Sequence, residues 1–219
     1  MQHPSDNVET IIKQVPVTYY QTGVQTNVLQ RLWHTNKLRI VCSLIPGQPK
    51  RILDVGCASG WFLSQLANRY PRARCTGVDI YKEAIAYGTR LYPKLRLIHA
   101  DASKIPLPDG SCDLIVCNEV LEHVSNPQAV LTEIKRLLAP GGCAIIEMDT
   151  GNMLFRFVWS LWTSAKGKVW HDAHVFRFNE KILEDMIKNV GFTTKEKRIF
   201  NTSMAVAFRV KSMQPGPSG

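Results

Sequence analysis

A strand-like run that leads into a turn of small residues is the stretch of this chain best suited to hold a ligand. It covers residues 51–60, with the sequence RILDVGCASG, and its two glycines are Gly56 and Gly60. Glycine lets a ligand approach the backbone closely, and a helix that follows offers the N–H groups of its first turn. The carboxylate of Asp54 would repel a pyrophosphate here but would attract a ligand with a cationic amino group. The stretch therefore predicts a site for a nucleotide-like ligand that carries positive charge.

Polar residues, mostly acids, recur where the next strands are expected to end. These strand-end residues are Asp79 with Ile80, Asp101 with Ala102, and Asn118 with Glu119. In an open α/β sheet a ligand lies across the carboxyl ends of the strands, at the point where strand order reverses. An acid in the position of Asp79 can accept both ribose hydroxyls of an adenosine. A dinucleotide enzyme would place an acid similarly, so Asp79 alone does not separate the two classes.

Strand-like and helix-like segments alternate from residue 51 onward. Strands are predicted at 51–55, 73–79, 95–99, 113–117 and 143–148, and helices at 60–70, 82–92 and 127–139. Continuous apolar strands between helices are typical of a parallel sheet with helices on both faces. A helix at 179–190 precedes two closely spaced strands, predicted as a β-hairpin at 192–200 and 203–210. We predict an α/β fold with a doubly wound, Rossmann-like sheet of seven strands, mostly parallel with an antiparallel strand in the C-terminal hairpin.

The acid and glycine pattern resembles motif I of the class I S-adenosylmethionine-dependent methyltransferases, acid-x-Gly-x-Gly-x-Gly, with Ala58 in place of the middle glycine. The Gly-x-Gly-x-x-Gly pattern of dinucleotide-binding proteins fits worse, because its second and third glycines would fall on Ala58 and Trp61. Matching motifs follow in order through residues 51–148, including CNEVLEHV and LLAPGG. The resemblance implies S-adenosyl-L-methionine as the cofactor. It implies cofactor binding by Asp54, Gly56, Ala58, Gly60, Asp79, Ile80, Asp101, Ala102, Asn118 and Glu119.

The residues that face the methyl acceptor are expected outside the cofactor motifs. Many small-molecule methyltransferases carry a histidine at the place of His174, so the resemblance makes His174 the first catalytic candidate, followed by His171, with Arg177 as a substrate-binding residue. His123 either faces the methyl group or is a histidine at a helix start. The spacing of His171 and His174 also fits a metal pair, but no third ligand matches, so no metal is predicted. Tyr19 and Tyr20 are either substrate contacts or an ordinary packing pair.

Residues 153–162 are rich in aromatic and apolar side chains and have three interpretations. They form a lid over the active site, a hydrophobic patch for a lipid or quinone, or a core helix. Lys166 and Lys168 follow closely, as in helices that lie in a membrane interface. Arg156 has apolar neighbours on nearly every face, which favours burial under a lid as much as membrane contact.

Charge is unevenly distributed along the 219 residues, whose formal net charge is +9. Residues 101–150 hold 3 basic and 8 acidic side chains, which suits a cationic sulfonium. The basic remainder is compatible with nucleic acid, an anionic membrane or simply a solubilising surface. The Asn-Pro-Pro-Tyr and Pro-Cys signatures of nucleic-acid methyltransferases are absent from the end of the 113–117 strand, so nucleic acid is not favoured as substrate. The six cysteines lack zinc-ligand spacing, which predicts reduced thiols in a cytoplasmic protein.

The chain has a length that suits one domain. We expect an N-terminal preamble and cap helix in 1–48, with the helix at 22–44, and a methyltransferase domain in 49–211. Within that domain, 150–178 is the lid and substrate segment, and 212–219 is a disordered tail. The predicted activity is methyl transfer to a small-molecule or lipid-like acceptor, with peripheral membrane contact through 153–168 and no transmembrane segment. Methylation of RNA or protein, and a non-catalytic methyltransferase-like binding module, are the alternatives.

Overall fold

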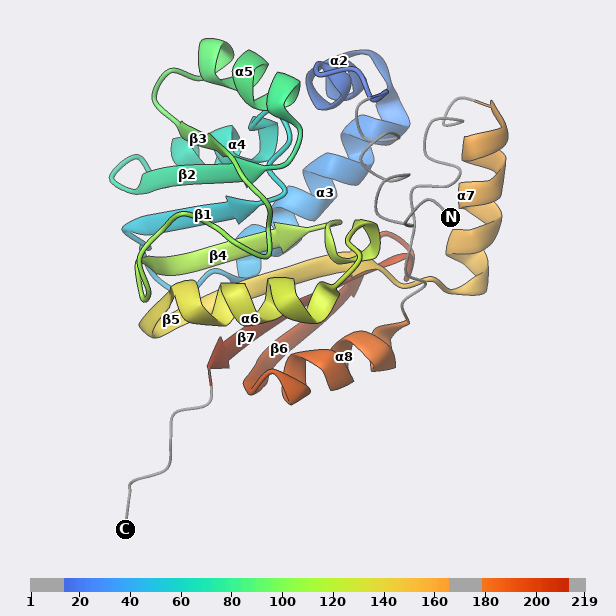
Figure 1. Ribbon diagram of the computed structural model, residues 1–219. Helices are drawn as coiled ribbons and strands as arrows, with labels where there is room; N and C mark the ends of the chain where they lie inside the picture. The colour runs from blue at the N-terminus through green and yellow to red at the C-terminus, as the bar shows by residue number, and fades with distance from the viewer. Residues whose placement is uncertain (1–13, 166–178, 213–219) are drawn as a thin grey trace, which may run out of the picture.

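A seven-stranded sheet in the order β3-β2-β1-β4-β5-β7-β6 forms the centre of the molecule (Figure 1). The structure is a computed structural model that describes residues 14–165 and 179–212. The strands are β1 Arg51–Val55, β2 Arg74–Asp79, β3 Arg96–His99, β4 Cys112–Asn118, β5 Leu138–Asp149, β6 Phe192–Phe200 and β7 Ala205–Ser212. Strands β1 to β5 pair in parallel, whereas β7 is antiparallel to both β5 and β6. The predicted mostly parallel sheet with an antiparallel C-terminal hairpin is confirmed.

Helices cover both faces of this sheet. They are α2 Tyr19–Thr26, α3 Val28–Leu44, α4 Trp61–Arg69, α5 Lys82–Leu91, α6 Pro127–Leu137, α7 Met153–Ala165 and α8 Glu180–Asn189, with a 3₁₀ turn, η1, at Leu121–His123. Leu44 of α3 and Leu63 of α4 belong to the hydrophobic cluster on one face. Ile134 of α6 and Leu183 of α8 belong to the cluster on the other. The order of the strands in the sheet reverses between β1 and β4, so a crevice forms at the carboxyl ends of these two strands.

The N-terminal helical region differs from its prediction in two ways. It begins at Tyr19 and is broken at Asn27, whose extended backbone ends α2 and whose side chain caps α3 by accepting hydrogen bonds from the N–H groups of Leu29 and Gln30. Two apolar residues of this pattern, Leu29 and Leu32, are exposed at 69% and 61%, whereas Val41 is buried. The buried stripe of α3 is instead His34, Lys37, Val41 and Leu44. Helix α3 therefore directs a lysine and a histidine inward.

The C-terminal hairpin has a longer connection than the two residues expected. Asn201, Thr202 and Ser203 all have positive φ, so extended backbone resumes only at Ala205. All six cysteines are free and five of them are buried, in agreement with the prediction of unpaired thiols. Among the described helices none is long and apolar enough to cross a membrane.

Candidate active site

The turn after β1 is held by its neighbours in a conformation that requires glycine at its first position. Gly56 has φ of +74°, and a Cβ added to it would lie 2.2 Å from a methyl carbon of Val120. The N–H groups of Gly56 and Cys57 both donate to the carbonyl of Val78 in β2. Gly60, with φ of +82°, then leads into α4. The strand, tight turn and helix predicted from residues 51–60 are therefore present.

Asp79 at the end of β2 organises the same turn from the opposite side. Its Oδ2 accepts a hydrogen bond of 2.7 Å from the Ala58 N–H, and its Oδ1 accepts one of 2.8 Å from the Tyr81 N–H. Ala58 has φ of +47°, a left-handed conformation that costs alanine roughly 1 kcal/mol or more. The hydrogen bond to Asp79 offsets that cost, so Ala58 occupies the conformation that the middle glycine of the pattern would adopt.

Asp54 lies in β1 behind this turn and is buried, with 2% of its surface exposed. Its Oδ2 has no hydrogen-bond partner in the part of the chain that the structure describes. Burial, with a smaller contribution from the negative charge of Asp79, raises the pKa of Asp54 to about 8. The carboxyl group is thus protonated at neutral pH in the folded protein, whereas an unfolded chain would ionise it near pH 4.

Replacement of Asp54 by asparagine is expected to change the pH dependence of stability. Between pH ~4 and 8 the folded protein holds a proton that the unfolded chain has lost, so the free energy of unfolding falls as the pH rises through that window. Asp54→Asn removes this titration, and its stability relative to the wild type should rise with pH by up to about 1.4 kcal/mol per unit. Urea unfolding at several pH values measures the difference. Asp185→Asn, at an exposed position of α8, is the control, and parallel profiles for wild type and Asp54→Asn would contradict the prediction.

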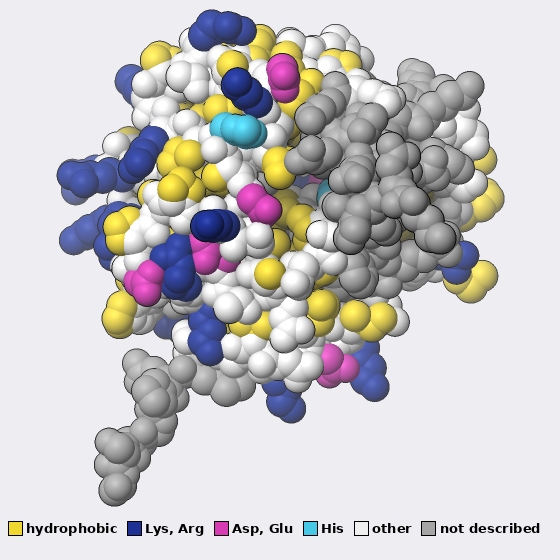
Figure 2. Space-filling model, viewed as in Figure 1, with side chains coloured by type: hydrophobic (Ala, Val, Ile, Leu, Met, Phe, Trp, Pro, Cys, Tyr) yellow, Lys and Arg dark blue, Asp and Glu magenta, His cyan; other side chains and the backbone are white. Residues whose placement is uncertain are grey.

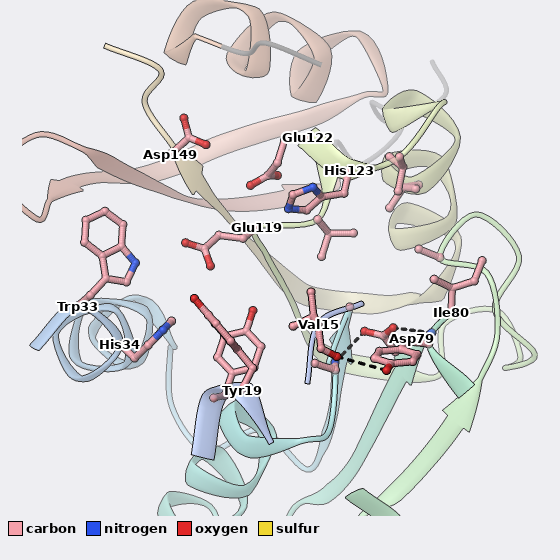
Figure 3. A pocket seen from close by; sticks show the side chains of 18 of the residues that line it. Val15, Tyr19, Trp33, His34, Asp79, Ile80, Glu119, Glu122, His123 and Asp149 are labelled. Atoms are coloured by element: carbon pink, nitrogen blue, oxygen red, sulfur yellow. Dashed lines mark hydrogen bonds between the residues drawn. The ribbon is translucent and has the colours of Figure 1, made fainter. Parts of the chain in front are cut away.

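A cavity of about 1170 Å³ opens over the carboxyl ends of the strands. Seven of the predicted cofactor residues line it: Gly56, Ala58, Asp79, Ile80, Asp101, Ala102 and Glu119. Asp54, Gly60 and Asn118 are set back from its wall. Tyr19 and Tyr20 also line the cavity, with their rings edge to face at 5.4 Å. The structure therefore brings together residues from 19 to 119 of the chain around one space (Figure 3).

A buried lysine of α3 meets the tips of β4 and β5 beside this cavity. Lys37 is 3% exposed, and its Nζ lies 2.6 Å from Glu119 Oε2 and 3.5 Å from Glu147 Oε2. Burial would lower the pKa of Lys37, but the two carboxylates more than offset that effect and the pKa is raised. Burial would likewise raise the pKa of Glu119, but Lys37 lowers it to about 2. Glu119 and Lys37 therefore form a buried ion pair that ties the N-terminal helix to the site.

Trp33, His34 and Lys37 are the functional-site residues that the sequence analysis missed. Trp33 and His34 line the cavity, and the His34 ring contacts the rings of Tyr20 at 5.2 Å and Trp61 at 6.0 Å. Burial, followed by the charge of Lys37, lowers the pKa of His34 to about 4, so its imidazole is neutral at pH 7. His34, Lys37 and Val41 are three and four residues apart, so they lie on one side of helix α3. This spacing was the sequence signal that could have indicated their common burial.

Of the residues predicted to face the acceptor, His123 is the one histidine that the structure describes. It ends η1 and lines the cavity near Glu119 and Glu122 (Figure 3). His171, His174 and Arg177 lie outside the described residues, as do the lysines at 166 and 168, so their roles stay predictions.

Helix α7 has two apolar sides. Its buried Phe155 stacks on Trp159 with ring centroids 5.6 Å apart, and both residues line the cavity. Met153 and Phe157 on the outside are exposed at 86% and 64%. Arg156 is exposed as well, so the burial that its apolar neighbours suggested is wrong. One side of α7 thus covers the cavity while the other faces outward.

Comparison with known proteins shows which domain and fold the chain resembles. Residues 53–146 match the family model described as a methyltransferase domain. A solved SAM-dependent methyltransferase from Thermotoga maritima superposes with a TM-score of 0.72 at 19% identity, over 92% of this chain and 98% of that one. Residues 53–146 are thus similar to a methyltransferase domain, and the chain has the fold of solved S-adenosylmethionine-dependent methyltransferases.

Two curated relatives of this chain are named for different acceptors. A malonyl-[acyl-carrier protein] O-methyltransferase from Hahella chejuensis is 31% identical over 134 residues, which are 60% of this chain and 46% of the relative. A ubiquinone biosynthesis O-methyltransferase from Acinetobacter baumannii is 28% identical over 159 residues, or 67% of this chain and 65% of the relative. The chain thus spans less than half of the first relative and just under two thirds of the second.

The residues that line the cavity fit S-adenosyl-L-methionine, the cofactor of the methyltransferases that the chain resembles. The Asp79 carboxylate is held by backbone N–H groups at the cavity wall, where ribose hydroxyls could donate to its remaining lone pairs. Ile80 offers an apolar surface next to it, as an adenine ring requires. At Asp101, Oδ1 accepts from the N–H and Oγ of Ser103 and leaves Oδ2 available as an acceptor. Gly56 lines the cavity, so a ligand can reach the backbone of the turn.

Proposed function

We propose that this protein transfers the methyl group of S-adenosylmethionine to a small-molecule or lipid-like acceptor. The observation that carries the proposal is the single cavity of about 1170 Å³, which joins the cofactor residues at one end to an aromatic wall at the other. Sites for one drug-sized ligand are roughly 300–1,000 Å³, so this cavity has room for a cofactor and an acceptor together.

The bound cofactor supplies an electrophilic methyl group, so the chain itself has to bind, orient and exclude water. Asp79 and Ile80 would fix the adenosine end, and the turn at Gly56 would hold the amino-acid end. Phe155 and Trp159 of α7, with Trp33 of α3, close the far side with apolar surface. Alignment of two reactants in a dry site can supply much of the acceleration of a group transfer.

The position of the basic residues supports a small acceptor over nucleic acid. Exposed lysines and arginines gather where the first three strands begin, at Lys50, Arg51, Arg72, Arg74, Lys94 and Arg96 (Figure 2). The cavity opens at the other end of those strands, about 17 Å away for a strand of five residues. A nucleic acid held by this basic edge would not reach the cavity with its bases.

Exposed apolar side chains beside the cavity support a lipid-like acceptor. Met153, Phe157 and Leu161 of α7 and Leu29 and Leu32 of α3 are exposed, and both helices also line the cavity. Arg156 and Arg31 are exposed on the same helices. Apolar residues flanked by basic ones suit contact with an anionic lipid surface from which an acceptor is taken.

Calorimetric titration with S-adenosylmethionine and S-adenosylhomocysteine, with NAD as the control, tests the proposal. We expect the first two to bind and NAD not to bind. A methyl-transfer assay would then offer phenols, quinones and lipids, the last both free and in anionic vesicles. Absence of binding by both cofactor forms would overturn the proposed activity and favour a non-catalytic binding module.

A further inference from the structure

Four carboxyl groups meet at the inner end of the cavity, and we name them the acid cluster: Glu119, Glu122, Glu147 and Asp149. They come from the end of β4, from η1 and from the end of β5. Lys37 pairs with Glu119 and Glu147. Glu122 and Asp149 have no cationic partner in the described part of the chain, although both line the cavity. The cluster therefore carries more acid than the protein neutralises.

Glu122 shows most directly that a ligand is needed at this place. It is 2% exposed, and its Oε2 has no hydrogen-bond partner among the described residues. The carboxylates of Glu119, Glu122 and Asp149 turn toward one region of the cavity (Figure 3). A buried carboxylate without a partner is costly, whereas an ammonium group placed between two of them would offset that cost.

The walls around the acid cluster are aromatic. Trp33, Phe155 and Trp159 line the same cavity, together with Tyr20. Aromatic faces attract a desolvated cationic nitrogen, and carboxylates do so more strongly. An anion would be repelled by Glu119 and Asp149, and a neutral hydroxyl compound would leave the Asp149 carboxylate without a cation. The combination selects a cation with an apolar body.

We propose that this end of the cavity is the acceptor subsite and that it takes an amine in its protonated form, with the nitrogen between Glu122 and Asp149. This inference rests on the proposed methyl-transfer function and narrows its acceptor to an amine with an apolar body. The adenosine end of the cavity, at Asp79 and Ile80, lies apart from this subsite (Figure 3).

Binding of such an amine should release a proton. Burial, followed by the charge of Asp149, raises the pKa of Glu122 well above its ordinary value, and burial raises that of Asp149 to about 6. Glu119, Glu147, Lys37 and His123 also face this region. The ammonium ion would ionise Glu122 on binding, so affinity should rise with pH. Glu122 Oε2 can later take the ammonium proton: the N–H bond breaks and its electron pair stays on nitrogen, which makes the nitrogen a nucleophile.

Titration of the full chain saturated with S-adenosylhomocysteine tests the subsite without turnover. The probes are n-octylamine, n-octanol and n-octanoate, which share one apolar tail and differ in the head group. We expect n-octylamine to bind about tenfold or more tightly than n-octanol, and n-octanoate not to bind. The n-octylamine titration is then repeated in two buffers that differ in ionisation enthalpy. The difference between the two binding enthalpies should correspond to a net release of protons. Equal affinity for amine and alcohol in the wild type would overturn the proposal, whatever the variants do.

Variants assign the effect to the acids. Glu122→Gln and Asp149→Asn should each lose about tenfold in n-octylamine affinity and keep their n-octanol and S-adenosylhomocysteine affinities. Glu83→Gln, at an exposed position of α5, is the matched control. If Glu122→Gln instead weakens S-adenosylhomocysteine, the cluster serves the cofactor's own ammonium group and the proposal fails. If the wild type binds no S-adenosylhomocysteine, the proposed function fails before the amine is added, which keeps the two failures distinct.

Discussion

Asp79→Ala is expected to weaken S-adenosylhomocysteine binding by about a hundredfold, because two hydrogen bonds from ribose hydroxyls to a carboxylate are lost at ~1.5 kcal/mol each. The carboxylate is placed for this role by the N–H groups of Ala58 and Tyr81, which fix both of its oxygens at the cavity wall. Isothermal titration calorimetry measures the change. Asp79→Asn, which keeps one oxygen, should fall between the wild type and Asp79→Ala.

The same substitution also frees the N–H of Ala58, so the loss must be separated from damage to the turn. The unfolding temperature of Asp79→Ala reports that damage. Glu83→Ala is the control, since Glu83 is an exposed acid in the first turn of the next helix. Unchanged affinity in Asp79→Ala would place the ribose elsewhere in the cavity. A fall in affinity with an intact unfolding temperature supports direct contact.

The cofactor end of the site could be predicted because each of its residues lies at a strand end next to a local signal. Asp54 lies two residues before Gly56 at the end of β1, and Asp79 is the last of the six residues of β2. Parallel strands bring their carboxyl ends to one edge, so local patterns are enough to gather these residues. The sequence also shows that Ala58 replaces the middle glycine of the motif, but it does not show the positive φ of Ala58 or its hydrogen bond to Asp79.

The acid cluster could not be predicted in the same way, because it depends on a contact between distant segments. Pattern rules assign a lysine to solvent, and burial of Lys37 becomes favourable only once Glu119 and Glu147 stand opposite it. In α3 the exposed Leu29 and Leu32 dominate the apolar pattern and point to the wrong face. The ion pair between Lys37 and Glu119, which are more than eighty residues apart in the sequence, determines which side of α3 is buried.

Lys37→Met is expected to destabilise the protein by about 3–5 kcal/mol, the usual effect of removing one partner from a buried ion pair. Its side chain is 3% exposed, and its Nζ lies 2.6 Å from Glu119 and 3.5 Å from the buried Glu147, so the substitution leaves these carboxylates without a counter-charge. For a chain of this size, such a loss lowers the unfolding temperature by roughly 6–20 °C. Differential scanning calorimetry measures it, and Lys181→Met, at an exposed position of α8, is the control.

The triple variant Lys37→Met, Glu119→Gln, Glu147→Gln should recover most of the stability, because no buried charge is then left uncompensated. The pH dependence separates this explanation from loss of packing. Without Lys37, the pKa of Glu119 would rise above that of the unfolded chain, so the defect of Lys37→Met should grow as the pH rises and shrink toward pH ~5. A defect of the same size at every pH, unrelieved in the triple variant, would mean that Lys37 acts through its aliphatic packing. The ion pair would then not be what ties α3 to the site.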